Sequence, residues 1–105
     1  MYYKVVTADL KSLGLRRNPT IFTYKVGRWV NEPNPTKDAG GWGGTGGIWT
    51  TKTRSNAVRL MKYAESKSIK CKLFEVEIGD VLFANSYRTK TNKVKLLKEI
   101  SYEST

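Results

Sequence analysis

Only one segment of this chain repeats its apolar residues with the period of an α-helix, and this limits the fold more than any other feature. The apolar side chains in it recur at intervals of three and four residues, at Ala57, Leu60, Met61 and Ala64. Ser55 precedes them and can accept a hydrogen bond from the free N–H groups of the first turn. We therefore expect one main helix, capped by Ser55.

The remaining apolar residues alternate with polar ones, as they do in strands. This period of two, or a β-branched and aromatic composition, marks segments 2–7, 20–26, 48–51, 71–78 and the end of 87–100. In segment 71–78, Phe74, Val76 and Ile78 share one face and Glu75 and Glu77 the other. We expect an α+β fold: a single small domain over residues 1–105, with a largely antiparallel sheet of about five strands.

A long loop rich in glycine and proline is predicted at residues 31–47, since six of the nine glycines lie between positions 40 and 47. Gly41, Gly43 and Gly46 have the G-x-G-x-x-G spacing of a dinucleotide-binding turn. In such a turn a strand precedes the glycines and a helix follows them at once, whereas here a strand-like segment follows. We interpret the segment as a loop, in which Trp42 either anchors a contact or packs back onto the core.

The absence of histidine excludes Ser-His and Cys-His nucleophiles and argues against hydrolysis by zinc. The single cysteine, Cys71, excludes an internal disulfide and suits a reducing compartment. No stretch of about 18 apolar residues and no export signal is present. We expect a protein of the bacterial cytoplasm with no cofactor, no metal and no membrane segment.

The charge predicts an anionic partner. Nineteen Lys and Arg stand against nine Asp and Glu, a net charge of +10, and such an imbalance attracts nucleic acid. The candidate binding residues are Trp42 and the basic side chains Arg54, Arg59, Arg88, Lys90, Lys93 and Lys95, with Trp49 and Tyr87 available to stack on bases. The alternative is a basic face that is merely solvated.

Three stretches in the late half of the chain follow one another in an informative order: "GGIWTTKT", a helix beginning at Ser55, and "FEVEI". This order is similar to the late half of small ADP-ribosyltransferase-like domains. The resemblance implies that Thr50, Thr51 and Thr53 stand for the hydroxyl motif of the family and Glu75 or Glu77 for its catalytic acid. The chain departs from the family in its first strand, where only Lys4 replaces the Arg or His that holds the nicotinamide dinucleotide. We therefore expect likeness of fold more than of activity. The pattern alone also allows a solvated strand face at Glu75 and Glu77.

Read from end to end, segments such as "YYKVVTADLKSLGLR" and "LFEVEIGDVLFANSYRTKTNKVKLLKEI" resemble a family of short proteins encoded by phages and mobile elements of Gram-positive bacteria. Proteins of this size and source include anti-CRISPR inhibitors of Cas9. The resemblance implies a non-enzymatic, counter-defence binding protein. An inhibitor with this charge would bind an acidic face, or the guide RNA or DNA held by Cas9. The two alternative hypotheses are a divergent ADP-ribosyltransferase-like enzyme and a general DNA- or RNA-binding phage protein.

Overall fold

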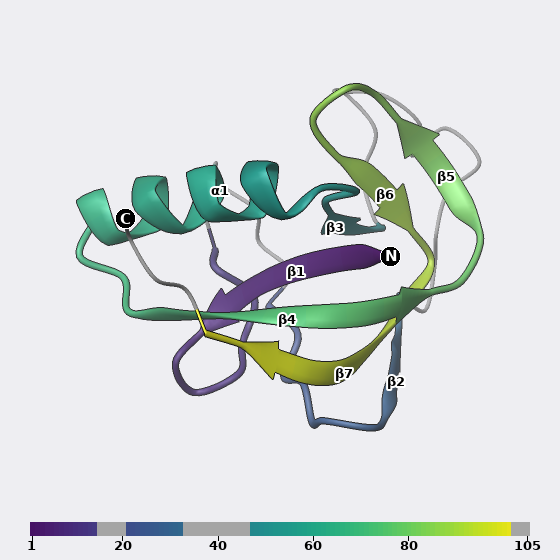
Figure 1. Cartoon of the computed structure of the whole chain (residues 1–105). Helices are drawn as coiled ribbons and strands as arrows, with labels where there is room; N and C mark the ends of the chain where they lie inside the picture. The colour runs from purple at the N-terminus through teal and green to yellow at the C-terminus, as the bar shows by residue number, and fades with distance from the viewer. Residues whose placement is uncertain (15–20, 33–46, 102–105) are drawn as a thin grey trace.

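The computed structural model of the chain describes residues 1–14, 21–32 and 47–101, which form one helix and two antiparallel sheets (Figure 1). The elements are β1 (Tyr2–Thr7), β2 (Trp29–Asn31), β3 (Ile48–Thr50), α1 (Arg54–Ser66), β4 (Cys71–Ile78), β5 (Val81–Ala84), β6 (Thr89–Thr91) and β7 (Lys93–Ile100). The larger sheet has the strand order β1-β4-β7-β2, and the smaller one β3-β6-β5. The α+β class is confirmed, with the strands divided between two sheets instead of forming one.

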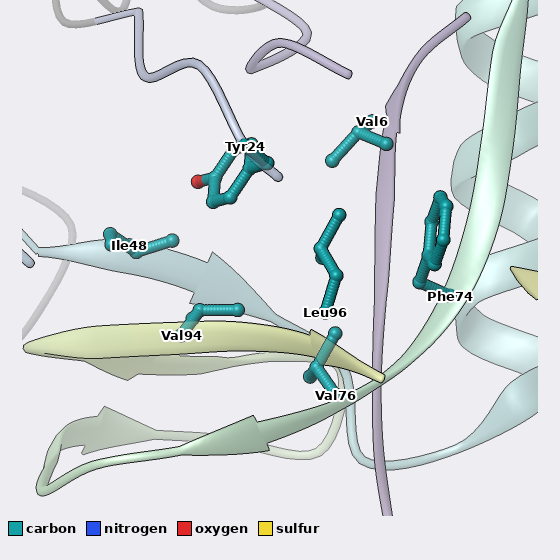
Figure 2. Close-up of a cluster of buried hydrophobic side chains, with 7 residues drawn as sticks. All are labelled: Val6, Tyr24, Ile48, Phe74, Val76, Val94 and Leu96. Atoms are coloured by element: carbon teal, nitrogen blue, oxygen red, sulfur yellow. The ribbon is translucent and has the colours of Figure 1, made fainter. Parts of the chain in front are cut away.

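The larger sheet is buried on both faces where α1 covers it. Neighbouring residues of β1 point to opposite sides, so Val5 packs with Ala57 and Met61 of the helix. Val6 points the other way, into the cluster drawn in Figure 2, where side chains of β4 and β7 meet Tyr24 and Ile48. Strands buried on both faces carry adjacent apolar residues, which explains the neighbouring Val5 and Val6 of β1.

Two segments differ from the sequence-based expectation. Residues 21–26 form no regular strand and touch residues 10–12 through the isolated bridge between Thr23 and Lys11. Their alternation buries Tyr24 in the core, while Val26 stays exposed in a turn that leads to β2. Residues 89–91, which precede the strand expected at the end of 87–100, form the central strand β6 of the smaller sheet. Of the predicted loop at 31–47, Asn31 ends β2 and residues 33–46 lie outside the described residues.

The chain passes between the two sheets twice at one corner, where β4 leads to β5 and β6 leads to β7. The side-chain oxygen of Asn92 accepts a hydrogen bond from the backbone N–H of Asp80 at 2.8 Å, and the N–H of Gly79 donates to the carbonyl of Lys93 at 2.9 Å. A Cβ at position 79 would lie 2.3 Å from Asn92 Oδ1. Glycine therefore allows the close approach that forms the corner.

Helix α1 begins one residue after Thr53, which caps it in place of the predicted Ser55. Thr53 has an extended backbone, and its hydroxyl accepts a hydrogen bond from the N–H of Asn56 at 3.3 Å. The predicted apolar face is confirmed, since Ala57, Met61 and Ala64 are buried.

The cap gives a direct test of this correction. Thr53→Ala should lower the free energy of unfolding by about 1 kcal/mol, because it leaves an N–H group of the first turn without its acceptor. Ser55→Ala should change it by less than about 0.5 kcal/mol, the usual range for a surface substitution. Urea unfolding followed by circular dichroism measures both changes. A larger loss of stability for Ser55→Ala than for Thr53→Ala would show that Ser55 is the cap.

Candidate functional site

The predicted basic residues do not form one continuous surface. They fall into a cluster on the larger sheet, a second cluster on the smaller sheet, and two arginines on the helix. Trp42 lies outside the described residues, as do Gly41, Gly43 and Gly46 of the glycine pattern.

The first cluster, which we call the Trp29 surface, consists of Trp29, Lys93, Lys95 and Glu77. Trp29 of β2, Lys95 of β7 and Glu77 of β4 are paired in one row across three strands. The Lys93 and Lys95 ammonium groups lie 4.6 and 5.1 Å from the centre of the Trp29 ring. Lys95 Nζ also lies 3.8 Å from a carboxylate oxygen of Glu77. Because Trp29 remains 37% exposed, this surface presents an aromatic ring and two cations to solvent.

The local sequence explains why these side chains share one face. Val94 and Leu96 are fully buried in the core, so the alternation of β7 turns Lys93 and Lys95 outward. At Leu97 the strand carries one extra residue, since Val76 pairs with Leu96 but Glu75 pairs with Lys98. The bulge keeps the lysine at position 98 on the same face. The Trp29 surface thus lies on the helix side of the larger sheet, on the strands beyond β1.

The second cluster is built around Trp49 and is largely interior. Arg88 and Lys90 each place their charged group 4.8 Å from the centre of the Trp49 ring, and Phe83 meets the ring edge-on at 6.1 Å. Lys90 is only 1% exposed, and burial lowers its pKa. Its aliphatic stem passes Gly47, where a Cβ would lie 2.5 Å from its Cγ and Cδ atoms. Lys90 therefore belongs to the packing between strands and is not presented to a partner.

Lys4 is a second buried lysine, on the core face of β1. Its ammonium donates a hydrogen bond to the carbonyl of Trp49 at 2.6 Å and lies 5.5 Å from the centre of the Tyr24 ring. Burial lowers the pKa of Lys4 to about 8. Desolvation also raises the pKa of Tyr24, whose hydroxyl has no hydrogen-bond partner in the described part of the chain.

The two helix arginines lie apart from one another. Arg54, at the first helical position, donates a hydrogen bond to the carbonyl of Ser101 at 3.1 Å. Arg59 is exposed one and a half turns later. Neither has a contact with Trp29 or Trp49 among the interactions of the described residues.

The residues that stand for the ADP-ribosyltransferase motif are brought together only in part. Thr51 forms an isolated β-bridge with Tyr3 of β1. Glu75 of β4 is paired with the same Tyr3, across the other edge of β1. Lys4, one residue further along β1, points to the opposite face of the sheet. Lys4 and the two glutamates, Glu75 and Glu77, therefore lie on opposite faces of the sheet. A dinucleotide site would need all of them on the same face.

An open groove of about 600 Å³ lies between the end of α1, the start of β4 and the end of β7, and sequence reasoning missed it. Cys71 lines it, and the carbonyl of Met61 is 3.9 Å from the Cys71 sulfur. Burial and the nearby Glu65 carboxylate raise the pKa of this thiol, so it is less reactive than a free cysteine.

Sequence reasoning also missed Trp29. Its signal was present in the "GRWVN" segment, where Trp29 and Asn31 alternate with the half-buried Val30. Within residues 1–14, 21–32 and 47–101, no three His, Cys, Asp or Glu side chains are grouped to hold a metal ion. The helix in these ranges is too short and too polar to cross a membrane.

Comparison with known proteins gives no relative from which a site could be transferred. The chain matches no protein-family model, and neither the curated proteins nor the solved structures contain a significant match.

Proposed function

We propose that this protein binds single-stranded nucleic acid through the Trp29 surface, as a binding protein and not as an enzyme. The observation that carries the proposal is an exposed tryptophan with two lysine ammonium groups within 5.1 Å of its ring centre. Proteins that bind single strands combine aromatic rings, on which bases stack, with cations that follow the phosphates. The net charge of +10 supplies the long-range attraction.

The sheet geometry favours a single strand over a duplex. Reading a duplex in its major groove requires a helix or a two-stranded ribbon that fits into the groove. The Trp29 surface instead lies on the face of a four-stranded sheet and includes its edge strand β2, where unpaired bases can lie flat. The expected ligand is a short stretch of RNA or DNA in which one base stacks on Trp29.

The experiment is fluorescence anisotropy with labelled 12-nucleotide oligo(U), oligo(dT) and a duplex, each at 50 and 200 mM salt. Lys93→Gln combined with Lys95→Gln should weaken single-strand binding about tenfold and make its salt dependence shallower, because fewer counterions are released. Lys67→Gln combined with Lys70→Gln is the matched control: it removes the same charge, and Lys67 also stacks on an aromatic ring, that of Tyr63 at 5.6 Å. Equal losses from both pairs, or preference for the duplex, would contradict the proposed surface.

In the counter-defence form of the proposal, the nucleic acid is held by a nucleoprotein such as guide-loaded Cas9. This form draws on the resemblance to phage and mobile-element proteins, and it requires the same lysines. Pull-down of tagged protein with guide-loaded Cas9 distinguishes the two forms. Retention after nuclease treatment and at high salt supports the nucleoprotein, whereas nuclease-sensitive retention supports free nucleic acid as the ligand.

A further inference from the structure

We infer that Glu77 competes with the ligand for Lys95, so that Lys93 is the main phosphate-binding cation of the Trp29 surface. This inference rests on the proposed function and specifies which lysine of its site binds the phosphate. It assigns unequal roles to two lysines that the amino-acid sequence presents as equivalent.

Lys95 lies in the middle of the cross-strand row of the Trp29 surface. Lys95 stands between Trp29 on β2 and Glu77 on β4, and its ammonium is 3.8 Å from the Glu77 carboxylate. A carboxylate and a phosphodiester each carry one negative charge shared by two oxygens, and both accept short, charge-assisted hydrogen bonds from an ammonium group. Glu77 therefore already fills the place that a phosphate would take beside Lys95.

Lys93 lies close to the same ring but outside the ion pair of Lys95 with Glu77. Its ammonium is nearer to the Trp29 ring than that of Lys95, at 4.6 Å against 5.1 Å. The ion pairs of the described residues include Lys95 with Glu77 but none with Lys93. A phosphate next to a base stacked on Trp29 would meet at Lys93 an ammonium group that has no ion pair within the described part of the chain. At Lys95 it would also meet the negative charge of Glu77.

The sheet also contains a matched ion pair on its other face. Lys72 and Glu99 are 3.9 Å apart, and the Glu99 side chain is 53% exposed, against 54% for Glu77. Glu99 is paired with the core residue Phe74, so it points away from the Trp29 surface. Like Glu77→Gln, Glu99→Gln removes one negative charge and one ion pair, but on the face of the sheet opposite to the proposed site.

The test is oligo(U) binding at 50 mM salt. Glu77→Gln should raise the affinity about fivefold, the effect of removing a like charge a few ångströms from a phosphate in water, and the gain should shrink at 200 mM salt. Glu99→Gln should change the affinity by less than about twofold. Equal gains from the two variants would show a general charge effect and overturn the inference.

A double-mutant cycle tests the unequal roles directly. In the wild type, Lys95→Gln should weaken binding less than about twofold and Lys93→Gln about fivefold; in the Glu77→Gln background both should cost about fivefold. Losses at Lys95 that are the same in both backgrounds would overturn the competition. If the wild type fails to bind the oligonucleotide at all, the proposed function fails; if it binds and the cycle is additive, only the role of Glu77 fails. Circular dichroism of each variant confirms that the fold is retained.

Discussion

Replacing Gly47 with alanine should lower the free energy of unfolding by about 2–4 kcal/mol, the sum of backbone strain and crowding. Gly47 has a φ of +81°, a conformation that disfavours a side chain, and an added Cβ would lie 2.5 Å from two carbons of the buried Lys90 stem. The stem cannot move aside freely, because Lys90 is fully enclosed with its ammonium over Trp49. Urea unfolding measures the effect.

Gly27 is the matched control for this prediction. Its φ of +83° is nearly the same, but a Cβ there would meet nothing within 4 Å. Gly27→Ala should therefore cost only about 1 kcal/mol, the backbone term alone. If the two substitutions cost the same, Lys90 does not pack against Gly47 as described.

The free energy of unfolding should also rise by about 2 kcal/mol between pH 7 and pH 9.5, owing to Lys4. Burial lowers the pKa of Lys4 to about 8 from 10.5, so the folded chain loses this proton at a lower pH than the unfolded chain. Below pH 8 both states are protonated, and the folded state bears the cost of a buried charge. As the pH rises toward 10.5, that cost disappears and stability increases.

Other groups titrate nearby, so the measurement is a difference. Burial raises the pKa values of Cys71 and Tyr24, which lowers stability at alkaline pH, while the lowered pKa of Lys90 acts in the same direction as Lys4. Lys4→Met removes only the Lys4 contribution. Subtracting its pH profile from that of the wild type should leave a rise of about 2 kcal/mol. Parallel profiles for the two proteins would show that Lys4 keeps its ordinary pKa in the fold.

The parts of the fold that could be predicted are those in which one residue pattern dominates. The face of α1 and the alternation of β4 were both predicted correctly, because burial on one side imposes a period on the sequence. The strand β6 was missed because its sequence, "TKT", contains no apolar residue, although all three residues are buried. Their burial depends on a long-range arrangement: the lysine reaches Trp49, and a threonine hydroxyl reaches the carbonyl of Asp80 at 2.7 Å.

The same reasoning explains the outcome for the candidate site. The sequence grouped Arg88, Lys90, Lys93 and Lys95 because they are close along the chain. Because the chain turns at Asn92, Arg88 and Lys90 lie at the smaller sheet, whereas Lys93 and Lys95 lie on the larger one. No local pattern indicates that corner, and none indicates that Trp29 lies opposite Lys95. Those relations depend on which strands pair, which the residues of one strand do not specify.

The position of β1 in the larger sheet has a consequence for how the chain folds during synthesis. Residues 2–7 are made before their ladder partner, residues 71–76 of β4, and β4 in turn pairs with β7. Until β4 has emerged from the ribosome, Val5 and Val6 of β1 have no partner strand with which to pair. Such distant pairing makes folding slow, and it leaves the apolar residues of β1 open to chaperones until β4 has been made. We expect the larger sheet to form all at once, only after β7 has left the ribosome.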